Sequence, residues 1–521
     1  MKKTFVVHPF LFAIFPVLFL FSHNITELLI NEIAVPIAVT TSFTFLLWLL
    51  LGFIFKDGKK AGLIVSLFLL LFFLYGHLPL KISFIATDFE IRHRYLFPIC
   101  VAILTPGIYL IIKTRKNLHN FTNILNVVAV FLILISLINI AAYEIKTKRL
   151  AMPNIQHPTS SIQHPTSKLL PDIYYIIFDN YGGSTMLQKF FNFNNSEITD
   201  YLKNKGFYIA SESCTNYPKT FQSLASSLNM KHLTYLTDKI GKESSDRTVV
   251  YEMLQDYEVW RFLKSRGYTF IHLGSWWGPT RKNRFADINI NYFHLNLSEF
   301  SAKLLETTML YPILGKIAGI DLRSEMKERI LLQFEKLSEI PCIKGPKFVF
   351  CHIIYPHSPY IFGPNGEFLL EQEVAKKSDR ENYLNEIIFC NKKIKLLVDQ
   401  ILSKSVYPPV IVLQADEGPS SLKEFKRKAG EEGIEWAQQS EVLLKLHMKI
   451  FNAYYLSNGS ASLTTGIDKN TLYPSITPVN SFRLIFNLYF GTNYELLEDK
   501  SYVFEDVEHP YKFIDVTDKV K

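Results

Sequence analysis

The chain has 521 residues, of which 48% are hydrophobic and 20% are charged, and its formal net charge is +8. This length predicts more than one domain. The lysines and arginines are scattered among many acidic residues and form no basic stripe, which argues against a nucleic-acid-binding protein. The small positive excess suits a protein that faces anionic lipid.

Long apolar runs fill the first third of the chain. A membrane-spanning helix needs ~20 mostly apolar residues with few charges. Runs of this kind occur at 8–22, 34–55, 61–80, 95–112 and 121–142. The sequence therefore predicts an integral membrane domain over residues 1–144, with about five helices.

The charges between these runs predict the orientation of the chain. The short basic segments MKK, KDGKK and KTRKN fall on one side of the predicted membrane, and basic short loops stay in the cytoplasm. The chain after the last span is then extracytoplasmic. Residues 145–170 are rich in Pro, Ser and Thr and contain IQHPTS twice, at 155–160 and 162–167. Because such a composition cannot bury a core, we interpret this segment as a linker.

Residues 171–521 alternate short β-branched or aromatic runs with helical patterns. The strand-like runs are 173–178, 207–211, 268–274, 347–355, 410–414 and 450–456. Continuous apolar strands that alternate with helices predict an α/β domain, with a mostly parallel sheet sandwiched between helices. Ligands bind such sheets at the carboxyl ends of the strands.

Polar side chains stand at three of these predicted strand ends. Asp179 follows the first strand, His357 follows the fourth, and Asp416 with Glu417 follows the fifth. If Asp179, Asp416 and Glu417 converge, they provide hard oxygen ligands for a divalent cation. The alternative for Asp416 and Glu417 is an ordinary acidic turn.

Thr220 stands directly before a helical pattern. Its apolar residues have i, i+3, i+4, i+7 spacing and are Phe221, Leu224, Ala225 and Leu228. This pattern predicts that Thr220 is the N-cap of the helix. A hydroxyl at a helix N-terminus also faces the place where a phosphate or sulfate binds, and a cation on its oxygen would make it a nucleophile. The spacing leaves both roles open.

The segment PDIYYIIFDN, the threonine at a helix start, the His-x-Pro-Tyr at 357–360 and the Asp-x-Gly at 416–418 occur in that order. This order resembles the sulfatase-like branch of the alkaline phosphatase superfamily, and most closely its membrane-anchored lipoteichoic acid synthases and phosphoethanolamine transferases. The resemblance implies that Asp179 and Asp416 are metal ligands. It also implies that Thr220 is both a ligand and the nucleophile, and that His357 contacts the substrate.

Glu417 departs from the family pattern, which has a histidine at that position. The departure implies either a preference for Mn²⁺ or Mg²⁺ over Zn²⁺, or a site that has lost its activity. His272 and Trp277, at another strand end, form either a substrate wall or a packed aromatic turn. His352, inside the fourth strand, is interpreted as structural. The segment around Cys214 does not match the C/S-x-P-x-R of sulfatases, which disfavours sulfate ester hydrolysis.

The resemblance implies a multi-pass protein of the bacterial cytoplasmic membrane with a catalytic domain over 171–521. Its activity would be a metal-dependent phosphotransferase or phosphodiesterase that moves a headgroup from a membrane lipid donor to a glycan or lipid acceptor. The alternative is a non-catalytic protein that binds an envelope glycan or a protein partner. A transporter is disfavoured because the spans lack buried charges. The external cysteines permit one or two disulfides, and their spacing leaves the pairing open.

Overall fold

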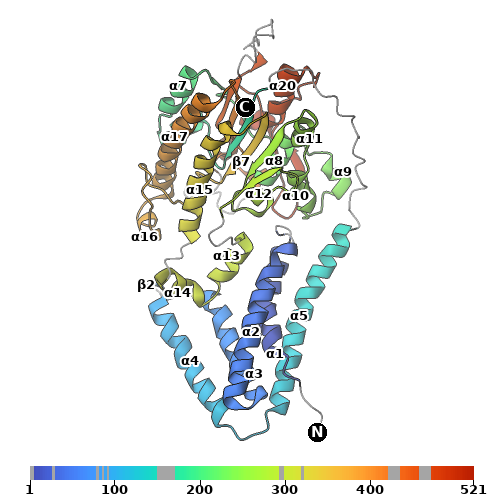
Figure 1. The fold of residues 1–521 in the computed structure, drawn as a ribbon, viewed down its shortest axis with the longest axis vertical. Coiled ribbons are helices and arrows are strands. Elements are labelled where there is room, and N and C mark those ends of the chain that lie inside the picture. Colours follow the sequence, from blue (N-terminus) through green and yellow to red (C-terminus); the bar gives the residue numbers. More distant parts are fainter. Residues whose placement is uncertain are drawn as a thin grey trace. The chain divides into compact units, whose positions relative to one another are not determined.

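The computed structural model describes residues 5–25, 28, 30–77, 81–84, 87–90, 93–148, 170–292, 298–317, 322–419, 435–456 and 471–521. The contacts within the chain divide it into two compact units. The first joins Met1–Pro153 to Asn296–Leu322, and the second joins Asn154–Leu295 to Arg323–Lys521. Figure 1 colours the chain from blue at its N-terminus to red at its C-terminus. The predicted linker repeats at 155–160 and 162–167 lie outside the described residues.

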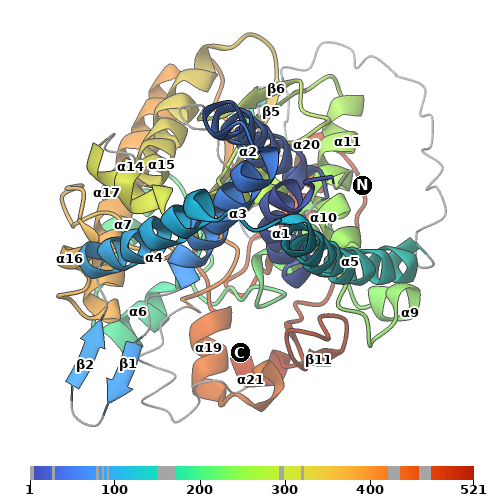
Figure 2. The same cartoon turned by 90° about the horizontal axis from the view of Figure 1, so that it is seen from below.

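The first unit is built from apolar helices. They are α1 (His8–His23), α2 (Ala34–Phe55), α3 (Gly58–Leu74), α4 (His93–Lys113) and α5 (His119–Lys148). In Figure 2, α1, α2 and α3 gather together while α4 and α5 extend to either side of them. Within the described residues, four segments are long and apolar enough to cross a membrane, and α1 is a shorter apolar helix. Phe53 is 84% exposed and Leu110 is 65% exposed, as expected for side chains that face lipid.

Residues 296–322 also belong to the first unit, although they fall within the predicted catalytic domain 171–521. They form α13 (Glu299–Glu306) and α14 (Leu310–Ile317). Phe300 of α13 packs in one core with apolar side chains of α1, α3 and α5. The Gly76 amide at the end of α3 donates to the Thr307 carbonyl at 2.8 Å. A hairpin of β1 (Lys81–Phe84) and β2 (Thr87–Glu90) precedes α4.

The second unit contains a seven-stranded sheet with the order β4-β9-β8-β3-β7-β5-β6. Its strands are β3 (Ile173–Phe178), β4 (Tyr208–Ile209), β5 (Thr269–Leu273), β6 (Ile288–Ile290), β7 (Lys347–Ile353), β8 (Val410–Ala415) and β9 (Asn452–Leu456). The pairs among β8, β3, β7, β5 and β6 are parallel, and β9 pairs antiparallel with β8 and β4. Each predicted strand is present, and the mostly parallel α/β sheet is confirmed. The three-residue β6 was not predicted because it is too short to show a pattern.

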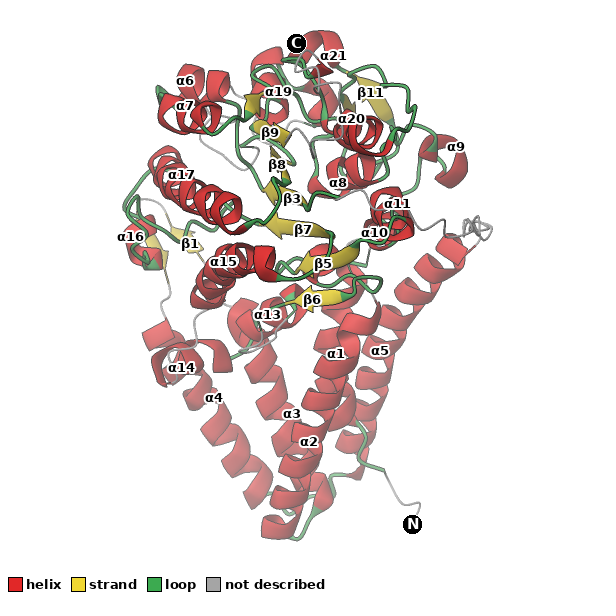
Figure 3. Cartoon of the chain, turned by 45° about the horizontal axis from the view of Figure 1, so that its top comes forward, coloured by secondary structure: helices red, strands yellow, loops and turns green. Residues whose placement is uncertain are grey.

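Helices cover both faces of this sheet (Figure 3). One face carries α6 (Ser184–Phe191), α7 (Ser196–Asn204), α15 (Leu322–Glu339) and α17 (Asp379–Lys404). The other carries α8 (Thr220–Leu228), α10 (Thr248–Gln255), α11 (Glu258–Ser265) and α20 (Pro478–Phe490). All six residues of β3 are buried because each face has a helical cover. Phe178 packs on Phe334 of α15, and Tyr175 packs on Phe482 of α20.

Shorter elements complete the second unit. The helices are α9 (Leu236–Ile240), α12 (Gly278–Arg281), α16 (Glu371–Val374), α19 (Glu441–Met448) and α21 (Thr517–Val520). The strands β10 (Tyr502–Phe504) and β11 (Phe513–Asp515) form an antiparallel pair. All five cysteines are free, so none of the disulfides that the sequence permits is formed.

Candidate active site

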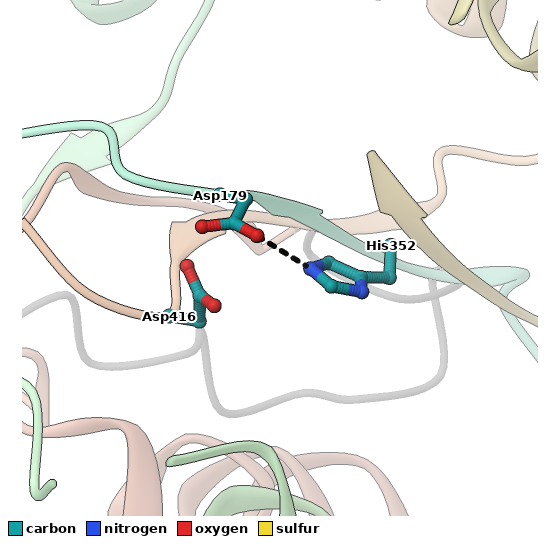
Figure 4. A group of neighbouring side chains, drawn as sticks. All are labelled: Asp179, His352 and Asp416. Atoms are coloured by element: carbon teal, nitrogen blue, oxygen red, sulfur yellow. Dashed lines mark ion pairs between the residues drawn. The ribbon is translucent and has the colours of Figure 1, made fainter. Parts of the chain in front are cut away.

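Three polar side chains converge where the neighbouring strands β8, β3 and β7 end. Phe178 of β3 is in register with Ala415 of β8, so the next residues, Asp179 and Asp416, leave the sheet side by side. His352 of β7 is in register with Ile177, two residues before Asp179. Because side chains two apart on a strand point to the same face, the imidazole reaches the two carboxylates. One ligand atom from each of Asp179, His352 and Asp416 lies within 4.8 Å of the other two (Figure 4).

Each of these three side chains has a buried polar atom without a hydrogen-bond partner. Among the described residues, Asp179 Oδ1, Asp416 Oδ2 and His352 Nε2 are buried and make no well-formed hydrogen bond. His352 Nε2 lies 3.6 Å from Asp179 Oδ2, which is too long for a hydrogen bond. Buried polar atoms left without partners are costly. Two carboxylates and one imidazole are a donor set that binds divalent transition metals, so the residues fit a metal ion.

The two carboxyl groups respond oppositely to this environment. Burial raises the pKa of Asp416 well above its ordinary value, and the neighbouring Asp179 and Glu417 carboxylates raise it further. Burial also acts to raise the pKa of Asp179, but the nearby His357 and His352 outweigh it and hold that pKa below its ordinary value. A buried pair of carboxylates cannot hold two uncompensated negative charges. The pair therefore needs a proton or a cation.

Thr220 lies beside Asp416. The helix α8 begins at Thr220, with Lys219 at the N-cap, so the prediction that Thr220 is the N-cap was wrong by one residue. The Thr220 side chain instead lies close enough to the Asp416 carboxyl to lower its pKa, which acts against the effect of burial. One turn further along α8, the Ser223 hydroxyl donates to the Asp416 backbone carbonyl at 2.8 Å. The helix thus holds Thr220 near the cluster of Asp179, His352 and Asp416, and Thr220 is only half-buried.

Glu417 is buried next to this group but is not part of it. Its backbone amide donates to Asp416 Oδ1 at 2.8 Å, whereas Asp416 Oδ2 is buried without a hydrogen-bond partner. The predicted role of Glu417 as a metal ligand stays a prediction. Gly418 follows in tight contact with another segment: a Cβ there would lie 2.4 Å from the Leu446 carbonyl oxygen. No side chain fits at that position, so the Asp-x-Gly order has a steric cause.

The predicted substrate-binding residues lie at different distances from the centre. His357, in the loop after β7, is half-buried and close enough to Asp179 to influence its pKa. Trp277 is half-buried, and its ring lies 6.0 Å from the His352 ring, nearly perpendicular to it. His272 lies within β5, fully enclosed, and its Nε2 is 2.8 Å from the Thr280 carbonyl oxygen. Burial lowers the pKa of His272 to about 4.

His352 is the residue at the centre that the sequence reasoning missed, because it was interpreted as structural. The sequence does contain a signal for this role. His352 is a polar residue near the end of an apolar strand-like run, just as Asp179 follows the end of another such run. Such a residue points either into the core or at the site, and only the pairing of β7 with β3 decides between them. Buried polar side chains require partners in both cases.

Neither a protein-family model nor a curated protein matches the sequence. Similar solved structures include the C-terminal periplasmic domain of EcEptC from Escherichia coli in complex with Zn, at 12% identity and a TM-score of 0.45, covering 70% of this chain and 96% of that chain. The integral membrane lipooligosaccharide phosphoethanolamine transferase A from Neisseria meningitidis is 13% identical, with a TM-score of 0.42, covering 93% and 95%. The putative sulfatase yidJ from Bacteroides fragilis is 10% identical, with a TM-score of 0.38, covering 66% and 83%. Phosphoethanolamine transferases and a sulfatase are thus among the similar structures. These likenesses are distant.

Proposed function

We propose that the chain is a membrane-anchored, metal-dependent phosphotransferase or phosphodiesterase that works through a covalent phospho-Thr220 intermediate. The observation that carries the proposal is the position of Thr220: its side chain lies close enough to Asp416 to influence the pKa of that carboxyl. Asp416 belongs to one cluster with Asp179 and His352, and each of the three has a buried atom without a hydrogen-bond partner. A hydroxyl held at the first residue of a helix, beside a metal-binding group, has the surroundings of an activated nucleophile.

The first displacement would use the closeness of Thr220 to Asp416. As the Thr220 oxygen forms a bond to the phosphorus of a phosphodiester, the hydroxyl proton passes to the Asp416 carboxylate. The ester bond to the donor alcohol breaks, and that alcohol leaves with its oxygen and takes up a proton. The half-buried His357 lies on the same side of the sheet as Asp179 and is suited to contact the anionic phosphate.

The second displacement reverses the first. An acceptor hydroxyl attacks the phosphorus, gives up its proton, and the bond between phosphorus and Thr220 breaks as the threonine oxygen regains a proton. The free amides at the start of α8 favour the negative charge of the phosphoryl group at this position. Water in place of the acceptor would make the same chemistry a hydrolysis.

Asp179, His352 and Asp416, with the Thr220 oxygen, would hold the metal ion. A bound divalent ion supplies stabilisation of negative charge on the phosphoryl oxygens and lowers the pKa of a hydroxyl beside it. The mixed oxygen and nitrogen donors admit Zn²⁺ as well as the Mn²⁺ or Mg²⁺ predicted from the sequence. We place the protein in the bacterial cytoplasmic membrane with the second unit extracytoplasmic. There the apolar helices keep the site close to a lipid donor and a glycan or lipid acceptor.

The proposal is tested by incubating the purified full chain in detergent with a bacterial lipid extract and mapping adducts by mass spectrometry. We expect a phosphoryl-type adduct on the peptide that contains Thr220, and its absence in Thr220→Ala. Thr199→Val, a change of another buried threonine in α7, is the matched control and should keep the adduct. Headgroup transfer that persists in Thr220→Ala would rule out the covalent intermediate.

A further inference from the structure

A chain of hydroxyl groups starts at the side of the His352 ring that faces away from Asp179. The ring nitrogen Nδ1 lies 2.9 Å from Thr280 Oγ1. Thr280 Oγ1 lies 2.7 Å from Ser275 Oγ. The Ser275 hydroxyl donates to the Trp277 carbonyl at 3.3 Å, and the Trp277 amide donates back to Ser275 Oγ at 3.1 Å. His352, Thr280 and Ser275 are all buried.

The protons along this chain can be assigned by counting them. A hydroxyl carries one proton to donate and two lone pairs to accept. All of these hydrogen bonds form together only if Ser275 gives its proton to the Trp277 carbonyl and accepts the hydrogen bond from Thr280. Thr280 has then used its own proton and can only accept from His352. The hydrogen bonds therefore place a proton on His352 Nδ1.

A neutral imidazole protonated on Nδ1 directs the lone pair of Nε2 at the site. That lone pair faces Asp179 Oδ2 at 3.6 Å, and two electron-rich atoms repel each other at this distance unless a cation lies between them. Ligands about 2.0–2.1 Å from a tetrahedral zinc ion are about 3.3 Å apart, close to the observed separation. Figure 4 shows the ring edge and both carboxylates turned toward one another.

We propose that Thr280 is a positioning residue that fixes the tautomer of His352, and that His352 thereby supplies the nitrogen ligand of the metal centre. This rests on the proposed function, because it requires that the centre binds a metal. Metal-bound histidines usually donate their other ring N–H to such a partner, which fixes the ring and raises its basicity. The imidazole nitrogen favours an ion of the zinc type over Mg²⁺.

Thr280 is itself held firmly. Its backbone carbonyl accepts from Nε2 of His272, and its amide donates to the Trp277 carbonyl at 3.1 Å. Burial lowers the pKa of His272 to about 4, so this imidazole is neutral and its single N–H is the one that donates. His272 therefore supports the short helix α12, which carries Thr280, and this role differs from the substrate contact predicted from the sequence.

The test measures metal affinity, which does not depend on turnover. The full chain in detergent micelles is stripped with a chelator and titrated with Zn²⁺ alone and with Mn²⁺ alone. We expect Thr280→Val, which removes only the hydroxyl, to weaken Zn²⁺ binding about 10–100-fold. Thr280→Ser, which keeps the hydroxyl, should bind within a few-fold of the unmodified chain. Thr199→Val is the matched control, because the Thr199 hydroxyl donates to the nearby Ser196 carbonyl and not to any residue of the proposed site.

Zn²⁺ binding by the Ser275→Ala variant is a second test of the proposal. Without Ser275 the Thr280 proton can turn toward His352 Nδ1, so the tautomer is no longer fixed and Zn²⁺ binding should weaken. If the unmodified chain binds Zn²⁺ and both Thr280→Val and Ser275→Ala bind it equally well, the proposal is overturned while the proposed function stands. If the unmodified chain binds neither ion, the proposed function and this inference both fail. Should Thr280→Val not fold, unchanged affinity in Ser275→Ala alone overturns the proposal.

Discussion

Ser223 ties the helix that carries Thr220 to the strand end that carries Asp416, because its hydroxyl donates to the Asp416 backbone carbonyl at 2.8 Å. Thr220 and Ser223 are three residues apart on α8 and so lie on one face of the helix. The Ser223 hydrogen bond holds the backbone of Asp416 next to the start of α8. The position of Thr220, the proposed nucleophile, is therefore fixed relative to the residue to which it would give its proton.

We expect Ser223→Ala to slow hydrolysis of bis(4-nitrophenyl) phosphate about 10–100-fold, because a small displacement of a nucleophile is costly. Metal affinity should change little, since Ser223 contacts a backbone carbonyl. Ser226→Ala on the same helix is the control, because its hydroxyl bonds to the Lys231 carbonyl instead. Equal rates in the two variants would show that this tie has no part in the reaction.

Both His352 and Glu417 are candidates for the third ligand of the proposed metal ion. Substituting each residue in turn shows which of the two contributes to metal affinity. We expect His352→Gln to weaken Zn²⁺ binding more than the about 10–100-fold typical of outer-shell partners, because it removes a ligand atom. Glu417→Gln keeps the size of the side chain and should have a smaller effect. Both are measured by titration of the chelator-stripped full chain. The reverse order of affinities would make Glu417 the ligand.

The sequence predicted the parts of this site that depend on local pattern. Asp179 and Asp416 each follow a short apolar strand directly, and a parallel sheet brings the ends of such strands to one edge. The helix after Thr220 shows its apolar spacing within nine residues, so its start was predicted to within one position. These features need no knowledge of which strand lies next to which.

The remaining features depend on contacts between distant segments. His352 faces the site only because β7 pairs with β3 in the observed register, and a shift of one residue would turn it to the other face. The Thr280 hydroxyl comes from the short helix α12, and the Ser275 hydroxyl comes from the segment that joins β5 to this helix. Likewise, α13 and α14 have ordinary amphipathic sequences, and only their contacts with α1 and α3 assign them to the first unit.

Gly418 is expected to tolerate no side chain. A Cβ there would lie 2.4 Å from the Leu446 oxygen and 2.9 Å from the His447 oxygen, and both are backbone atoms that cannot turn away. We expect Gly418→Ala to lower the free energy of unfolding by about 1–3 kcal/mol, measured by urea unfolding followed by tryptophan fluorescence. Gly52→Ala, where an added Cβ meets nothing within 4 Å, is the control. An unchanged midpoint in Gly418→Ala would contradict the steric argument.

Glu386 holds the loop that presents His357, and it makes the stability of the second unit depend on pH. Its carboxylate Oε1 accepts from the amides of Ile361 and Phe362, which close the turn after His357. Burial raises the pKa of Glu386 to about 7, from an ordinary value of 4.5. The folded state therefore binds the Glu386 proton more tightly than the unfolded state does. The stabilisation of the fold by this proton is complete below the unfolded pKa of 4.5, and it is lost as the pH rises through about 7.

This shift corresponds to about 3 kcal/mol between the two protonation states. We therefore expect the free energy of unfolding to fall between about pH 5 and about pH 8 by an amount of this order. Glu386→Gln keeps the accepting oxygen but carries no charge, so this decrease should disappear from its urea unfolding curves. Glu381→Gln, an exposed position on the same helix α17, should keep the decrease. If Glu386→Gln retained the full decrease with pH, its source would have to be another group, and the loop after His357 would not be held by a titrating carboxyl.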